Sequence, residues 1–153
     1  MCMGKVIRYR HKGCGFSYDF KEGVGFRLAA KEYKARTHMR NGDWGEKWKL
    51  LIEQYPDGTA TYAKTLFYCE ECNEYCTVPQ IIFYIPKADS SYQYDESDYV
   101  PDEILLDCFQ VLEKENISCP KCNREIKEME NLKKVPCLKC GQISEWKVVG
   151  HWD

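Results

Sequence analysis

The chain has 153 residues, a formal net charge of −2, and 44% apolar and 14% aromatic residues, the composition of a globular protein. No apolar run approaches the roughly 20 residues that cross a bilayer, and the N-terminal segment lacks the apolar core of a secretory signal, so a cytoplasmic protein is expected. In such a protein, ten cysteines favour metal ligation over disulfides.

The first third of the chain predicts a hairpin followed by two helices. Alternating apolar residues favour strands over 5–10 and 16–20. Residues 26–40 are rich in helix formers. A second helix is expected to begin at Asp43, with Glu46 completing a capping box. Its apolar stripe is expected to be core and consists of Trp44, Trp48, Leu51, Ile52 and Tyr55.

The rest of the chain predicts mainly strands. The acidic segment 86–101 has no periodicity and is expected to be a long exposed loop, and 102–108 to be a helical turn. Strands are predicted where β-branched, aromatic or other apolar residues are frequent, over residues 59–68, 77–85, 109–118 and 143–152.

Three Cys-x-x-Cys pairs are the clearest signal in the sequence. Each is followed by Asn or Gly, residues that adopt the positive φ needed after the second ligand of a metal knuckle. A fourth segment, His11-Lys-Gly-Cys14-Gly15, fits the same pattern if histidine replaces the first cysteine. We number the knuckles in chain order: 11–14, 69–72, 119–122 and 137–140.

Four knuckles predict two tetrahedral sites, each with four ligands. Fourteen residues separate the third knuckle from the fourth, a spacing typical of one contiguous site made of Cys119, Cys122, Cys137 and Cys140. The other site is then a split one made of His11, Cys14, Cys69 and Cys72. Cys76 is the alternative to His11 as its fourth ligand. Two Zn²⁺ ions are expected, although sulfur ligation also suits a single iron.

These elements predict an α+β fold, with antiparallel β-structure, two zinc ribbons and an inserted helical pair. The expected domains are a split ribbon with the helices over 1–100 and a C-terminal ribbon over 101–153. The long insertion between the halves of the split site is tolerable because loop-closure entropy grows only logarithmically with length.

The order of these motifs resembles a family of uncharacterised bacterial proteins with paired zinc ribbons. The resemblance covers most of the chain. In that family the first knuckle is Cys-x-x-Cys-Gly, so the match implies that His11 is a ligand here. It implies zinc binding and no established activity. Besides the cysteine pairs, the matching segments are 16–20, 23–26, 42–45, 55–58, 78–79 and 84–87.

The motifs favour a structural zinc protein without catalytic residues that acts through contacts with a protein partner. The fourth knuckle has the Pro-Cys-x-x-Cys of zinc deaminases, but no His-x-Glu accompanies it. The acidic loop 89–99, which carries tyrosines, is the expected contact. One alternative is nucleic-acid binding through the basic residues of the C-terminal ribbon. Another is electron transfer by a rubredoxin-like iron site. The basic residues are Lys121, Arg124, Lys127, Lys133, Lys134 and Lys139.

Overall fold

The computed structural model describes residues 4–23, 34–90, 92–94, 98–129, 132 and 134–152. These fall into two compact units. The first lies within Met1–Phe26, Ala63–Gln80 and Asn116–Asp153, and the second within Arg27–Tyr62 and Ile81–Glu115. This division differs from the boundary expected at residue 100, because each unit takes segments from both sides of it.

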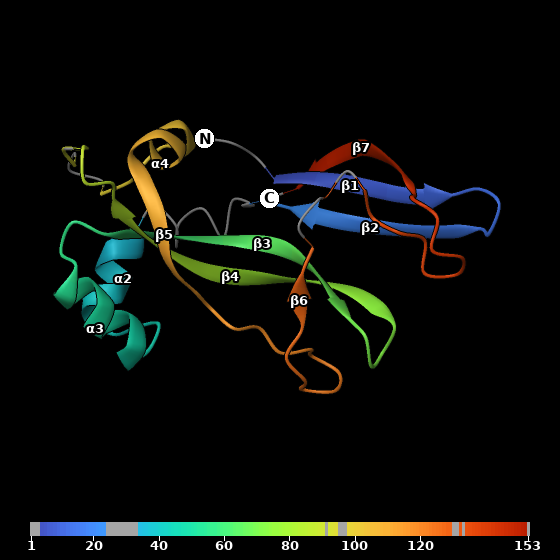
Figure 1. Cartoon of the computed structure of the whole chain (residues 1–153), viewed down its shortest axis with the longest axis horizontal. Coiled ribbons are helices and arrows are strands. Elements are labelled where there is room, and N and C mark those ends of the chain that lie inside the picture. Colours follow the sequence, from blue (N-terminus) through green and yellow to red (C-terminus); the bar gives the residue numbers. More distant parts are fainter. Residues whose placement is uncertain are drawn as a thin grey trace. The chain divides into compact units, whose positions relative to one another are not determined.

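Two β-hairpins organise the first unit, and the N-terminal one begins a three-stranded sheet. β1 (Gly4–His11) and β2 (Phe16–Glu22) are antiparallel, as the sequence predicts. β7 (Glu145–Trp152) pairs antiparallel with the other side of β1, giving the order β2-β1-β7. Figure 1 shows this pairing of blue strands with a red one. We call β1, β2, β7 and the first and fourth knuckles the outer module.

The second hairpin repeats this arrangement. It consists of β3 (Thr59–Cys69) and β4 (Glu74–Pro86), and the short β6 (Lys127–Glu128) pairs antiparallel with β3. The sheet order is β5-β4-β3-β6, so the first strand of the hairpin again lies between its partner and a late strand. We call β3, β4, β6 and the second and third knuckles the inner module, because the outer module encloses it in sequence.

The two modules share one core. Tyr9 and Phe20 from the outer module are fully buried in the same cluster as Leu66 from β3 and Val135. Tyr75 of β4 joins this cluster, and its hydroxyl donates a hydrogen bond to the carbonyl of Pro136 over 2.5 Å. Packing of this kind, with one polar group satisfied, holds the fourth knuckle next to the inner module.

The second unit contains the helical pair. α2 spans Ala35–Asn41 and α3 spans Glu46–Gln54. Residues 26–33 of the first predicted helix, like Cys2, lie outside the described residues. The predicted apolar stripe is confirmed as core: Trp48 and Ile52 are buried, and the stripe's other residues pack around the same cluster.

The capping box expected at Asp43 is wrong. α3 begins at Glu46 after Gly45, and no side chain caps it. Gly45, with φ 107°, is the residue at the N-cap position, so Asp43 lies two residues before the start that a capping box would need. The Asp43 carboxylate instead lies 2.8 Å from Nδ1 of His38.

The short helix predicted over 102–108 is confirmed as α4 (Asp102–Cys108), and β5 (Phe109–Lys114) follows it. β5 pairs with Ile82–Pro86 of β4, beyond Pro79, so the missing N–H of this proline does not interrupt the pairing. Val100, Leu105 and Phe109 form a small buried cluster.

Most described residues of the acidic segment before α4 are buried or half-buried, so the expectation of a long exposed loop holds only for Ala88, Asp89 and Gln93 among them. The buried guanidinium of Arg36 holds part of this segment. It donates to the carbonyls of Gly58 and Pro56, at 3.1 and 2.5 Å, and to Asp98 at 2.7 Å. The Tyr94 ring lies 3.8 Å from the guanidinium carbon, a cation–π contact.

The fold class is confirmed as α+β with antiparallel sheets. Among the helices in the described residues, none combines the length and the apolar character that crossing a membrane requires.

We predict that Arg36→Ala lowers the free energy of unfolding by about 3 kcal/mol, because it leaves two carbonyls without their donor and removes the more buried of the two arginines that pair with the Asp98 carboxylate. Arg40→Ala is the matched control. Arg40 bonds to the same carboxylate but is largely exposed, so its loss costs below about 1 kcal/mol. Denaturant unfolding of both variants measures the difference, and equal costs would contradict the anchoring role of Arg36.

Candidate metal centres

All four knuckles have the backbone conformation that the sequence predicts. The residue after each second ligand has positive φ: 66° at Gly15, 49° at Asn73, 61° at Asn123 and 77° at Gly141. For asparagine this conformation is uncommon, so its occurrence at both positions after a cysteine pair indicates that the turn requires it. The turn folds the chain back so that the two ligand side chains of a knuckle point the same way.

The late knuckles also share a hydrogen-bond pattern. In the third, the Asn123 amide donates to the Cys119 carbonyl, and in the fourth the Gly141 amide donates to the Cys137 carbonyl, at 2.9 and 2.8 Å. In the third knuckle, the backbone N–H of Cys119 also donates to the backbone carbonyl of Arg124 over 2.7 Å. In the fourth, the backbone N–H of Cys137 donates to the backbone carbonyl of Gln142 over the same distance. The two late knuckles are thus equivalent parts of the two modules.

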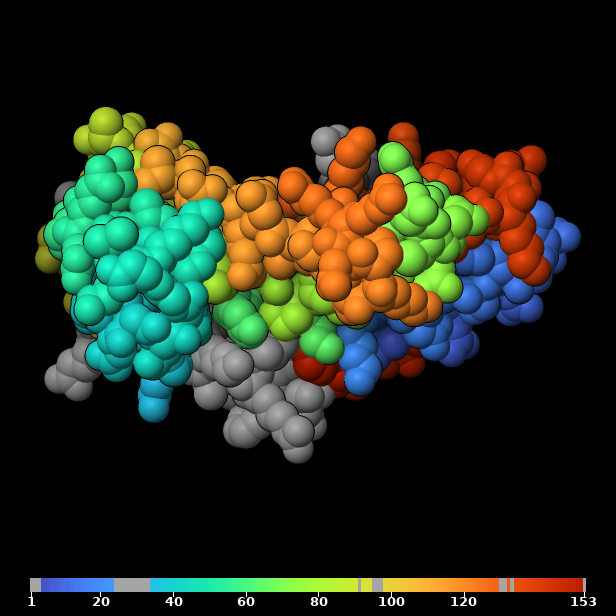
Figure 2. Space-filling model, turned by 90° about the horizontal axis from the view of Figure 1, so that it is seen from below, coloured from blue at the N-terminus to red at the C-terminus, as the bar shows by residue number. Residues whose placement is uncertain are grey.

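The eight expected ligand residues gather into two groups, in each of which the ligand atoms lie within 4.8 Å of one another. The outer site combines the first and fourth knuckles, and the inner site combines the second and third. Figure 2 shows the segment of the third knuckle (orange) against the turn between β3 and β4 (light green). The groups are His11, Cys14, Cys137 and Cys140, and Cys69, Cys72, Cys119 and Cys122.

This grouping corrects the one expected from sequence, in which the third and fourth knuckles shared a site. The reason lies in the strands that leave the late knuckles. β7 follows Cys140 and pairs with β1, which ends at His11. β6 follows Cys122 and pairs with β3, which ends at Cys69. Each late knuckle is therefore carried to the tip of a different hairpin.

The distances between ligand atoms suit a tetrahedral ion. With metal–sulfur bonds of about 2.3 Å, a tetrahedron has sulfur–sulfur edges of about 3.8 Å. In the inner site, Sγ of Cys69 lies 3.6 Å from that of Cys122, and Sγ of Cys72 lies 3.9 Å from that of Cys119. These separations are far too long for disulfides, whose sulfurs lie about 2.05 Å apart.

The outer site fits in the same way, with one nitrogen ligand. Nδ1 of His11 lies 3.5 Å from Sγ of Cys140. A tetrahedral edge between a sulfur at about 2.3 Å and a nitrogen at about 2.0 Å from zinc is about 3.5 Å. The outer site is also the more accessible one, because Cys140 is exposed, whereas no ligand of the inner site is.

One thiol in each site has a lowered pKa and so more thiolate character than an ordinary cysteine. Hydrogen bonds from the backbone N–H groups of Cys122 and Lys121 lower the pKa of Cys119 to about 7. For Cys137, burial raises the pKa, but the N–H groups of Lys139 and Cys140 help to lower it to about 7 overall. Thiolates are the form that binds metal, and backbone N–H donors remain aimed at the sulfur after binding.

Other thiols in the sites hold their protons in the absence of metal. The pKa of Cys14 is raised to about 11, mainly by a hydrogen bond shared with the Cys140 side chain. The pKa of Cys72 is raised to about 12, mainly by a hydrogen bond shared with the Cys122 side chain. Each metal ion must therefore displace protons from its site.

Complementary charges flank the inner site. The second knuckle carries Glu70 and Glu71, Glu74 follows at the start of β4, and the third knuckle region carries the cations that face them. Sequence patterns of this kind indicate which knuckles belong together, although each exposed pair contributes little to stability. The ion pairs are Glu74–Lys121, Glu71–Arg124 at 3.3 Å and Glu70–Lys127 at 3.8 Å.

Cys76, the alternative ligand to His11, belongs to neither group. It packs beside the inner site and lines a hollow of about 290 Å³ together with Tyr18 and Tyr75. Burial raises its pKa to about 11, so it stays a neutral thiol near pH 7. Cys108 is half-buried and packs against the small cluster of the second unit.

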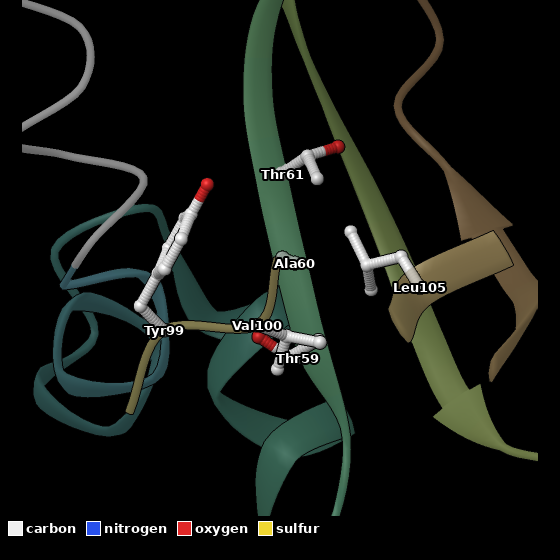
Figure 3. Close-up of a pocket in the computed structure, with 6 residues that line it drawn as sticks. All are labelled: Thr59, Ala60, Thr61, Tyr99, Val100 and Leu105. Carbon is white, nitrogen blue, oxygen red and sulfur yellow. The ribbon is translucent and has the colours of Figure 1, made fainter. Parts of the chain in front are cut away.

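The hollow in Figure 3 carries no site for a small molecule. It lies in the second unit, where Leu105 of α4 points toward β3 and Tyr99 flanks the strand. Its free space for a water-sized sphere is ≈ 0 Å³. The cysteine sites are therefore the stronger candidates for function.

The chain was compared with family models, curated proteins and solved structures, and none of them matches.

The grouping predicts which pairs of substitutions act on one site. We expect Cys69→Ser with Cys119→Ser to remove only the inner metal, leaving one ion per chain. The matched double variant, Cys69→Ser with Cys137→Ser, breaks both sites and leaves none. Metal analysis after gel filtration measures both. If Cys119→Ser with Cys137→Ser kept one ion while Cys69→Ser with Cys119→Ser lost both, the grouping by sequence proximity would be correct.

Proposed function

We propose that this protein is a non-catalytic zinc protein in which two structural zinc ions, one per module, form paired zinc ribbons, and that it acts through contacts with another protein. The observation that carries the proposal is the convergence of four knuckles into two groups with tetrahedral ligand spacing. In each module a hairpin and a late knuckle meet at the proposed ion, which is the architecture of a zinc ribbon.

Zinc is preferred over iron because of the outer site. Its ligand set, three cysteines and one histidine, is a common zinc set, whereas a rubredoxin-like iron site needs four sulfurs. Only the inner site offers four sulfurs among the described residues. The two modules are similar, so we expect them to hold the same metal in the same structural role. An iron electron carrier would account for the inner module alone.

The ligand number argues against catalysis at these ions. Catalytic zinc keeps one position for water or substrate, but each proposed site has four protein ligands. In the inner site the ligands are also buried or half-buried. The zinc ions would then stabilise the fold, which small modules need because their apolar cores are limited.

The ion pairs at the inner site weigh against nucleic acid as the partner. Lys121, Arg124 and Lys127 are three of the cations that a phosphate backbone would contact, and each pairs with a glutamate in or just after the second knuckle. These glutamates place negative charge beside each cation, which weakens the attraction of this surface for phosphates. A protein partner fits this mixed-charge surface better.

The test is metal content with a visible spectrum, on protein purified without added metal. We expect two zinc ions per chain and no absorption from iron. Removing the zinc with a strong chelator should unfold the first unit, because site formation and folding are coupled. Circular dichroism before and after chelation measures this.

A matched control strengthens the test. Cys76→Ser changes a cysteine next to the inner site that is not among its ligands, so it should keep two zinc ions, whereas Cys72→Ser should lose one. A protein that holds iron, or one whose fold is unchanged without metal, would contradict the proposed structural zinc.

A further inference from the structure

β7 is an edge strand of the outer module, and large apolar side chains are exposed along it between charged ones. In the described residues it has β1 on one side and no strand on the other. Natural edge strands are short or carry charges that discourage pairing with another chain. The apolar residues of this segment, between 39% and 53% exposed, are Ile143, Trp146, Val148 and Val149.

The inner module is an internal comparison, because its equivalent edge has the opposite character. Its edge strand β6 has only two residues. When the two modules are aligned on their late knuckles, Ile143 corresponds to Glu125 and Trp146 corresponds to Glu128. The module therefore folds with acidic residues at these positions. All exposed large apolar side chains in the described part of the first unit lie at the β7 edge. The equivalent edge of the inner module lacks such side chains, so the exposed parts of those along β7 offer apolar surface for a contact beyond the module.

The sequence of β7 is complementary to itself. If two copies pair antiparallel about an axis through Trp146, Glu145 lies opposite the partner's Lys147, and Lys147 opposite the partner's Glu145. The same register sets the two Trp146 side chains opposite each other. The opposite charges and this aromatic pair both favour the register, whereas an axis through Lys147 would set like charges opposite.

We propose that β7 is a homodimer interface, through which two copies of this chain join their outer sheets about a two-fold axis. The interface is isologous, so one strand supplies both halves of each charge pair. The bulge between Val148 and Gly150 ends the regular part of the edge, which keeps the paired segment short and the dimer reversible. This inference rests on the proposed function, because it names the partner of a protein that acts through protein contacts.

The test is a charge swap followed by sedimentation equilibrium over about 1 to 100 µM of zinc-loaded protein. In Lys147→Glu, Glu145 of each copy faces a glutamate at position 147 of its partner, and this repulsion should weaken the dimer about tenfold. Glu145→Lys should weaken the dimer to a similar extent, because lysines then face lysines. The double variant, Glu145→Lys with Lys147→Glu, restores opposite charges and should restore the wild-type dimer. Mixing the two single variants should give a heterodimer.

Controls separate this inference from the zinc proposal. Glu145 lies beside Arg10 and Lys147 beside Arg8 within the same sheet, so zinc content and thermal unfolding are recorded for every variant. A wild-type protein that is monomeric at all these concentrations with two zinc ions bound would overturn the dimer and leave the zinc proposal intact. A dimer that all four charge combinations form equally would overturn this interface.

Discussion

The fold of the first unit depends on one constraint: each late knuckle must reach the tip of a hairpin that lies far earlier in the chain. His11 and Cys140 are 129 positions apart in sequence, and Cys69 and Cys122 are 53 apart, yet their ligand atoms are within 3.6 Å. Bringing such distant segments together costs loop-closure entropy, which grows slowly with length but must be repaid locally. Strand pairing next to each knuckle and, in our proposal, a metal ion supply that stabilisation.

The pairing is nested, with the first knuckle joined to the last and the second to the third. Nesting lets both modules form without crossing connections, in keeping with the short, unknotted connections of natural folds. The second unit then takes Arg27–Tyr62, which runs into the second hairpin, and Ile81–Glu115, which runs from the end of that hairpin toward the third knuckle. The shared cluster around Tyr9, Leu66 and Val135 then couples the two modules, so loss of either site should weaken both.

Local chemistry made much of this predictable. The positive-φ residues after each knuckle identified all four turns, including the one that begins with His11, because the backbone conformation is set by the turn itself. The hairpins and the apolar stripe of α3 followed from periodicity. The pairing of knuckles did not follow, since cysteine spacing favours neighbours in sequence while the structure is decided by which strand lies beside β1 and β3. The glutamates of the second knuckle and the cations around the third were a usable signal for that choice.

The segment before α4 shows a second limit of sequence reasoning. Its acidic, aperiodic composition suggests an exposed loop, but one buried arginine, Arg36, binds it through Asp98 and the Tyr94 ring. Composition cannot reveal such an anchor, because the arginine is more than fifty positions away in the chain. The exposed apolar edge of β7 is the reverse case: residues that read as an ordinary core strand are left half-exposed because no strand covers them among those described.

The most direct test of the nested arrangement is heteronuclear NMR of the protein loaded with cadmium-113, in which couplings link each metal to the cysteines that bind it. We expect two cadmium signals. One couples to Cys69, Cys72, Cys119 and Cys122, and the other to Cys14, Cys137, Cys140 and the ring of His11. A single cadmium coupled to both Cys119 and Cys137 would contradict it.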